Sequence, residues 1–469
     1  MCEQDFWMKI NKLRIGTYYL FFLDIGIFLL LLISYFFKFY NISYMLYSII
    51  VLLLLLNIIL KFYIEKISFA SIMFIFNVTI FVFLGGRFLS YIYFRDFNPF
   101  ELTYMGYFLP TKKEELYVFM YFILFIISIN SGYFFLDIER KPTYKAIQIN
   151  KTILNIIFIF ALILFIFTLK NSFIKFIDTL NSGYLSLYKK QGQEYKLGDS
   201  FFEILTFILL AISSTYNSKK RSIIIYFCLF FYGLIIILAG SRGTFITTTL
   251  LGFWWVNRNK YVSLKKISIF GAIVFFGMLF LLTFSSRGTT LNTSSLTDAV
   301  FAFVKQQGIT FPIISYAINS VDTYPFMAYF KYFVPIAPVR IASLVFKKKY
   351  YLYELSFSGY TAFSLNSSDY LSGSGTGWSL LGNFYFFSFG NLIFFTVLCF
   401  LFGFFIKILE KKSMFSFFWF GLAIVVLPHL FFVSRAEFSS VYTTAILYSI
   451  LFLFFYLINT LLKKEHINE

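Results

Sequence analysis

Long apolar runs constrain the fold of this chain more than any other feature. Most of them hold about 18–23 residues, enough for a helix to cross a hydrocarbon core about 30 Å thick. Backbone groups find no water in that layer, so a spanning segment must satisfy them inside a helix or a closed barrel. A barrel would show alternating segments of about ten residues, which this chain lacks. We therefore predict an all-α polytopic membrane protein.

The apolar runs predict about twelve transmembrane helices. They lie at residues 17–37, 44–62, 68–86, 116–136, 152–169, 201–216, 222–239, 244–256, 267–284, 381–406, 414–433 and 441–461. We expect three regions: residues 1–284 hold nine helices with outward loops near 87–115 and 170–200, residues 285–380 form a large outward loop, and residues 381–469 hold the last three helices. An even number of crossings places both termini on one side.

Lysine and arginine residues indicate which side that is. They cluster beside both termini and in the even-numbered connections, whereas the short connections of the other side hold only Lys38, Arg242 and Arg435. Because short cytoplasmic loops are enriched in basic residues, we predict cytoplasmic termini, with Arg242 and Arg435 facing outward. This topology also explains the formal net charge of +18, so we expect contact with membrane lipids and no nucleic-acid partner.

The segment 326–346 is the main candidate for an additional membrane crossing beyond these twelve. It is apolar but contains Lys331, Pro335, Pro338 and Arg340. A crossing here would move Arg435 inside and the basic cluster 407–412 outside, against the charge pattern. We expect a re-entrant or interfacial segment instead.

The large outward loop shows signs of structure. Its apolar residues between Ile313 and Val321 recur at the spacing of an amphipathic helix, suited to lie on the membrane or to cap a cavity. The stretch 372–378 is too rich in glycine for a helix, and we expect Gly373, Gly375 and Gly377 to form a flexible loop over an external site. It lacks the lysine of a phosphate-binding P-loop.

Three arginines stand at the outward ends of predicted helices. They are Arg242 in Gly240-Ser241-Arg242-Gly243, Arg287 in Ser-Ser-Arg-Gly, and Arg435 in Ser-Arg-Ala-Glu. Guanidinium groups bind phosphate oxygens in pairs and stay charged at physiological pH, so three at one depth would hold a lipid diphosphate. The alternative is snorkelling to lipid headgroups, for which the four-residue turn around Arg242 leaves little room. The flanking Gly240 and Gly243 would let a ligand approach the backbone.

Two further side chains are candidates for proton transfer. Glu437 follows Arg435 by two residues, and we weigh catalysis equally against an ion pair that merely holds the turn. His429 lies about a turn and a half away and is a candidate base, although a single helix histidine is more often structural. No acidic pair or His/Cys cluster suggests a metal, and we expect no cofactor.

These features together resemble the bacterial O-antigen polymerases. The resemblance covers nearly the whole chain as architecture, and its local motifs are 238–243, the stretch 373–390 and 434–437. It implies a glycosyltransferase C-type fold and block transfer at the periplasmic face of the inner membrane. The growing glycan would move from undecaprenyl diphosphate onto a second lipid-linked repeat unit, with the arginines binding diphosphate. A chain-length regulator is an expected partner. Asn383 departs from the pattern, since relatives carry an acidic residue there.

Three other functions fit parts of this pattern. An O-antigen ligase would share the architecture and differ in its acceptor. A flippase for lipid-linked oligosaccharides would place its polar residues within the spans, where Asp24 is the clearest charge, rather than in a long outward loop. A non-catalytic assembly subunit would not need the arginine turns.

Overall fold

A computed structural model describes residues 3–135, 149–183, 197–215, 218–283, 295–334 and 338–468. Within them the chain is helical without a strand, and an isolated antiparallel bridge joins Leu102 to Phe108. The helices are α1 (Glu3–Phe36), α2 (Tyr44–Ile64), α3 (Ile72–Phe83), α4 (Gly86–Tyr91), α5 (Lys112–Phe135), α6 (Lys151–Ser182), α8 (Leu197–Ser214), α9 (Lys219–Leu238), α10 (Arg242–Asn257), α11 (Leu264–Thr283), α12 (Leu296–Gln307), α13 (Thr310–Asn319), η1 (Val321–Thr323), α14 (Met327–Phe333), α15 (Pro338–Phe346), η2 (Leu352–Leu355), α16 (Phe357–Leu365), α17 (Ser367–Leu371), α18 (Leu380–Phe387), α19 (Leu392–Ser413), α20 (Phe417–Leu430) and α21 (Ser439–Asn468).

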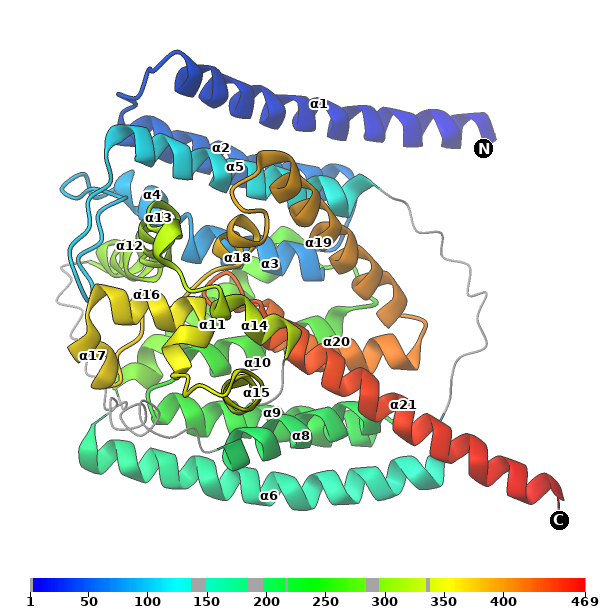
Figure 1. Ribbon diagram of the computed structural model, residues 1–469. Coiled ribbons are helices and arrows are strands. Elements are labelled where there is room, and N and C mark those ends of the chain that lie inside the picture. Colours follow the sequence, from blue (N-terminus) through cyan, green and yellow to red (C-terminus); the bar gives the residue numbers. More distant parts are fainter. Residues whose placement is uncertain are drawn as a thin grey trace.

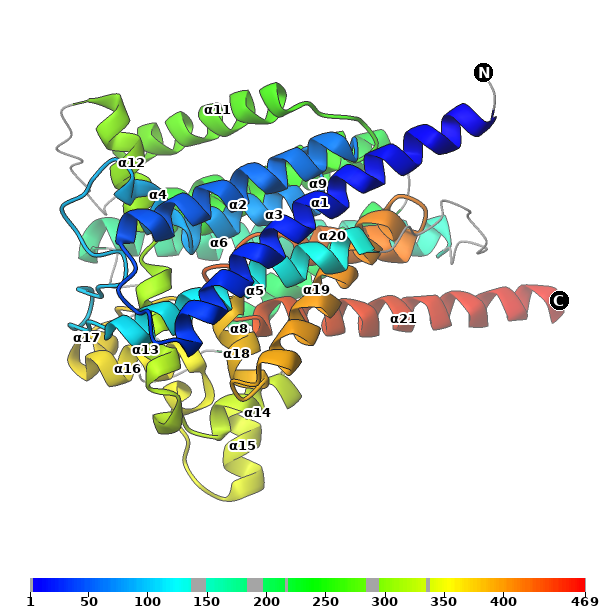
Figure 2. The ribbon, with the colours of Figure 1, turned by 90° about the horizontal axis from the view of Figure 1, so that it is seen from above.

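Seven helices of the described part are long and apolar enough to cross a membrane, which makes this a multi-pass membrane protein. They are α1 from Gly16 onward, α2, α5, α6, α9, α19 and α21, and most of them run in one common direction (Figures 1 and 2). Helices α3 and α20 and the apolar part of α8, Phe202–Ser214, are shorter. Each of the twelve predicted segments overlaps a helix, but the number twelve itself stays a prediction.

Two predicted boundaries are wrong. The segment 152–169 continues as α6 to Ser182, so helix replaces the start of the loop expected from residue 170. The segment 381–406 is two helices, α18 and α19, because the chain reverses between them. Gly390 adopts φ +69° there, and the Asn391 side chain caps α19 by accepting from the backbone N–H groups of Ile393 and Phe394.

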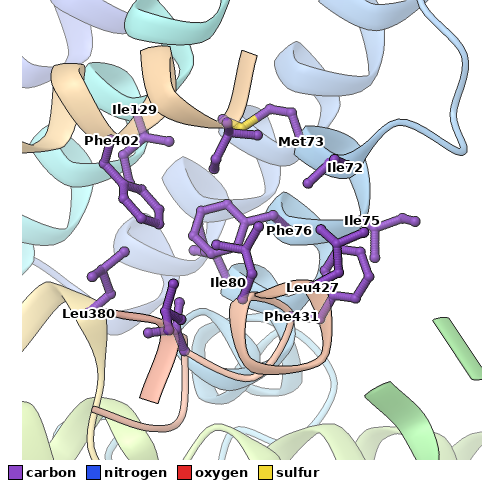
Figure 3. Close-up of a cluster of buried hydrophobic side chains, with 14 of the residues drawn as sticks. Ile72, Met73, Ile75, Phe76, Ile80, Ile129, Leu380, Phe402, Leu427 and Phe431 are labelled. Atoms are coloured by element: carbon purple, nitrogen blue, oxygen red, sulfur yellow. The ribbon is translucent and has the colours of Figure 1, made fainter. Parts of the chain in front are cut away.

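Helix α5 is the most buried of the seven candidate spans in the described part, with 83% of its apolar stretch buried. It crosses α19 at two glycines: a Cβ on Gly132 would lie 2.0 Å from the Phe400 carbonyl oxygen, and one on Gly403 would lie 1.9 Å from that of Ile129. Small residues permit this backbone contact, which drives helix association where lipid removes the hydrophobic effect. Figure 3 shows the apolar cluster beside the crossing, built by α3, α5, α18, α19 and α20.

A buried charge pair attaches α1 to α2. The Lys61 ammonium and the Asn57 side-chain amide both donate to the Asp24 carboxylate. Lys61 is fully buried, and its ammonium also lies 3.6 Å from the centre of the Phe21 ring. Asp24, the clearest charge within a predicted span, therefore has a packing role in this structure.

Short helices gather at one end of the bundle, where the large outward loop was predicted. The helix expected between Ile313 and Val321 is present as α13. The segment 326–346 contains α14 and α15, not one continuous span. Helix α15 is seen end-on in Figure 1 and lengthwise in Figure 2, so it lies across the direction of the long helices, as an interfacial helix would.

Enlarging a glycine at the α5–α19 crossing should destabilise the fold. We expect Gly403→Leu to lower the free energy of unfolding by roughly 1–3 kcal/mol, the cost of overpacking, because a Cβ at residue 403 would already lie 1.9 Å from the Ile129 carbonyl oxygen. Gly271→Leu in α11 is the matched control, since no heavy atom lies within 4 Å of a Cβ placed there. Thermal unfolding of the detergent-purified proteins compares them, and equal Tm values would contradict the packing assignment.

Candidate functional site

A cavity of about 930 Å³ opens between α4, α8, α9, α10, α12 and α20. Its charged and imidazole-bearing wall residues are Arg87, Asp96, Glu203, Arg242, Lys305, His429 and Arg435. Among the described residues, four cationic side chains thus face two carboxylates, which makes the cavity suited to an anion. The wall also has an apolar part that includes Ile204, Phe207, Leu210, Leu229, Ile246, Ile424 and Val425.

Arg242 enters the cavity wall as the first residue of α10. Helix α9 ends in a reversal in which the backbone N–H groups of Gly240 and Ser241 donate to the carbonyls of Ile237 and Ile236, at 2.8 and 3.0 Å. Gly240 has φ +96° there, a conformation that suits glycine. The turn therefore places a guanidinium at a helix N-terminus, where free backbone N–H groups add positive potential.

Arg435 approaches the same cavity from the turn 431–438, between α20 and α21. This arginine turn packs closely against α10, because a Cβ on Gly243 would lie 2.8 Å from the Phe432 ring. The Arg435 guanidinium donates to the side-chain oxygen of Gln307 at the end of α12 and lies 5.5 Å from the Phe83 ring centre. The structure thus brings together Arg242 and Arg435, which stand almost two hundred residues apart.

The glycine loop 372–377 lies beside the arginine turn. Gly375 and its neighbour Thr376 line the cavity, whereas Gly373 and Gly377 do not. Gly377 has φ +78°, and directly after it the Trp378 N–H donates to the Arg435 carbonyl at 3.2 Å. The loop therefore contributes a wall to the cavity and fixes the backbone of the arginine turn.

Glu437 lies outside the cavity lining and is 7% exposed. Its carboxylate accepts from the Lys331 ammonium at 2.9 Å, from the Ser356 hydroxyl at 2.5 Å, and from the backbone N–H and hydroxyl of Ser358, both at 2.7 Å. Burial would raise the pKa of Glu437, but Lys331 and the hydroxyl donors outweigh it and lower that pKa to about 2. Of our two interpretations, this geometry favours the ion pair that holds the turn.

Asn383 provides a second attachment for the same turn. Its side-chain oxygen accepts from the Phe438 N–H at 2.9 Å, and its amide donates to the Tyr332 hydroxyl at 2.6 Å. Tyr332 is on α14 beside Lys331, so α14 contacts the arginine turn through both Glu437 and Asn383. The amide accepts one hydrogen bond and donates the other, whereas a carboxylate would have to accept both, with the Tyr332 hydroxyl as a donor.

The remaining predicted residues have different places. His429 is half-buried on α20 and lines the cavity together with Pro428. Arg287 lies outside the described residues.

Sequence reasoning missed several cavity residues, chiefly Arg87, Lys305, Asp96 and Glu203. A signal for Arg87 was present, because Gly85-Gly86-Arg87 follows an apolar run much as Gly240-Ser241-Arg242-Gly243 does. Lys305 and Asp96 carry no comparable local pattern, since they reach the cavity only through the packing of α12 and of the loop after α4.

A model of the O-antigen polysaccharide polymerase Wzy family matches residues 19–466, nearly the whole chain. The chain belongs to this family. The resemblance read from the arginine turns and the large loop is thereby confirmed, and membership implies polymerisation of O-antigen repeat units, a glycosyltransferase-like reaction. Comparisons with curated proteins and with solved structures found no match.

Removing the Glu437 charge should destabilise this Wzy family member in a pH-dependent way. Because the pKa is lowered from 4.5 to about 2, the contribution to stability is complete above about pH 4.5 and is lost as the pH falls toward 2. Glu437→Gln should therefore cost on the order of 3 kcal/mol at pH 7, roughly that of breaking a buried ion pair, and less at pH 3. Thermal unfolding between pH 3 and 7 tests this, with Glu354→Gln in η2 as control, since a glutamine there keeps an acceptor for the Tyr351 N–H. A deficit that does not shrink on acidification would contradict it.

Proposed function

We propose that this protein polymerises undecaprenyl-diphosphate-linked repeat units by block transfer at the periplasmic face of the inner membrane. The observation that carries the proposal is the cavity, in which Arg242 and Arg435 share one space with an apolar wall. A lipid diphosphate has the same division, with an anionic head and a hydrocarbon tail. Family membership supplies the repeat units as the material that is joined.

The chemistry follows from the charges of the cavity. A hydroxyl of the acceptor sugar attacks the anomeric carbon of the donor glycan, the bond from that carbon to the diphosphate oxygen breaks, and undecaprenyl diphosphate leaves. Negative charge grows on the leaving diphosphate, so arginines already oriented toward it stabilise the transition state more than the ground state. Arg242 and Arg435 have this role.

The acceptor hydroxyl must also lose a proton. Of the two groups that the sequence suggested, His429 reaches the cavity and Glu437 does not. We assign His429 the role of candidate base and Glu437 the role of holding the arginine turn. The carboxylates of Glu203 and Asp96 are the other proton acceptors on the described cavity wall.

The apolar wall is suited to the polyprenyl chain. Its residues come from α8, α9, α10 and α20, which overlap the predicted spans 201–216, 222–239, 244–256 and 414–433. A tail entering between these helices would remain at the depth of the bilayer while the diphosphate meets Arg242. The start of α1 and the end of α21 lie toward the same end of the bundle (Figures 1 and 2), which supports placing both termini on one side of the membrane.

Arg242 substitutions test the diphosphate role. We expect Arg242→Ala to lower polymerisation at least a hundredfold, since loss of one preorganised donor to a developing charge costs about 10²–10³ in rate. Arg242→Lys should restore little, because a lysine lacks the paired donors of a guanidinium. The readout is the ladder of chain lengths at matched expression, with Arg258→Lys at the other end of α10 as control. A normal ladder in Arg242→Ala would remove this residue from the mechanism.

Deleting the gene separates the polymerase from its alternatives. Surface glycolipid with a single repeat unit on the core is expected, because ligation and flipping would continue without chain growth. A bare core would instead indicate a ligase or a flippase. Complementation with the wild-type gene should restore the full ladder and controls for effects on neighbouring genes.

A further inference from the structure

Two glycines bring α4 and α12 into backbone contact at the cavity. A Cβ on Gly86 would lie 2.6 Å from the Val304 carbonyl oxygen, and one on Gly308 would lie 2.4 Å from the Arg87 backbone nitrogen. The Ser90 hydroxyl extends the contact by donating to the Phe301 carbonyl at 3.0 Å. This crossing places Arg87 next to the last turn of α12, so its position is fixed by two backbones.

Arg87 is a buried cation on the wall of that cavity. It is 6% exposed, and one terminal nitrogen donates to the Asn98 carbonyl at 2.7 Å. Its Nε is buried without a hydrogen-bond partner, and no carboxylate of the described residues lies within 4.0 Å of its nitrogens. Burial lowers the pKa of Arg87 to about 10, partly offset by Glu101, so the side chain stays charged at neutral pH. A buried guanidinium with an unused N–H and, among the described residues, no paired carboxylate is suited to an anionic ligand.

Lys305 on α12 adds a second positive charge. Its ammonium lies 3.8 Å from the ring centre of Phe97, and the same ring lies 5.2 Å from the Arg87 guanidinium carbon. Burial lowers the pKa of Lys305. The nearby Arg87 charge lowers this pKa further, and the Asp96 charge raises it, so the three charged groups lie close enough to influence one another. Two cations therefore share one aromatic ring, and among the described residues neither Asp96 nor Glu101 forms an ion pair with them.

We propose that Arg87 and Lys305 form a second anion-binding subsite in the cavity, specific for a phosphate-type group. Arg87 supplies directional N–H donors and Lys305 a mobile charge, the combination that suits phosphate oxygens. The subsite adjoins the first, because Gln307 on α12 accepts from Arg435.

Two ligands would supply such a phosphate-type group, and naming them rests on the proposed function. One is the diphosphate of the second lipid-linked substrate, held while Arg242 and Arg435 bind the first. The other is the outer phosphate of a single diphosphate that reaches both subsites.

Binding of undecaprenyl diphosphate to the full-length protein in nanodiscs tests the subsite. The variants are Arg87→Met and Lys305→Met, and the matched controls are the exposed Arg95→Met and Lys113→Met. Lys305 is only partly buried, so its replacement keeps the test valid even if Arg87→Met folds poorly. Native mass spectrometry counts bound lipids and a titration gives the affinity.

We expect at least a tenfold loss of affinity at one site in both variants and none in the controls. Two lipids on the wild type and one on the variants would identify the second substrate as the source, whereas one lipid that binds more weakly to the variants would identify a shared diphosphate. Unchanged stoichiometry and affinity in both variants would overturn the subsite. If Arg242→Met alone then weakens binding, the proposed function stands without the second subsite; if the wild type binds no diphosphate lipid, both fail.

Discussion

The buried carboxylate of Glu437 is the interaction on which the site depends. It draws Lys331 of α14 and the start of α16 against the turn that carries Arg435. With its charge satisfied by one ammonium and several hydrogen-bond donors, the carboxylate tolerates burial that would otherwise be prohibitive. The outer helices and the cavity are thereby one unit, because moving α14 would also move the arginine two residues before Glu437.

Close backbone contacts at glycines recur in this structure, both at the cavity and in the apolar core. Gly243 admits the arginine turn to α10, Gly86 and Gly308 join α4 to α12, and Gly132 and Gly403 join the central α5 to α19. In a bilayer, apolar surfaces gain little by leaving lipid, so close backbone contact replaces the hydrophobic effect. Where such contacts lie beside the cavity, they also fix the arginines carried by the adjoining backbone.

The sequence predicted the helical membrane class, the position of α13 and the loop character of 372–377, because each depends on local periodicity or on glycine content. It did not predict the break between α18 and α19, where an apolar run continues through a turn that Gly390 and Asn391 create. Hydropathy averaged over a window does not register the short turn Ser388–Asn391, since the helices on either side are strongly apolar. The sequence also did not predict that α6 extends to Ser182, because the last turns of this helix are polar and lower its hydropathy.

The sequence by itself determined that Arg242 and Arg435 stand in short turns beside apolar helices, since the cost of a charge near lipid is a local property. Only the tertiary structure decided that they share one cavity with Arg87 and Lys305, and that Glu437 lies outside the cavity lining. The reason is physical: convergence of charges depends on helix crossings and on which face each turn presents. Those follow from contacts between residues far apart in the chain, such as Gly86 with Gly308 and Lys331 with Glu437.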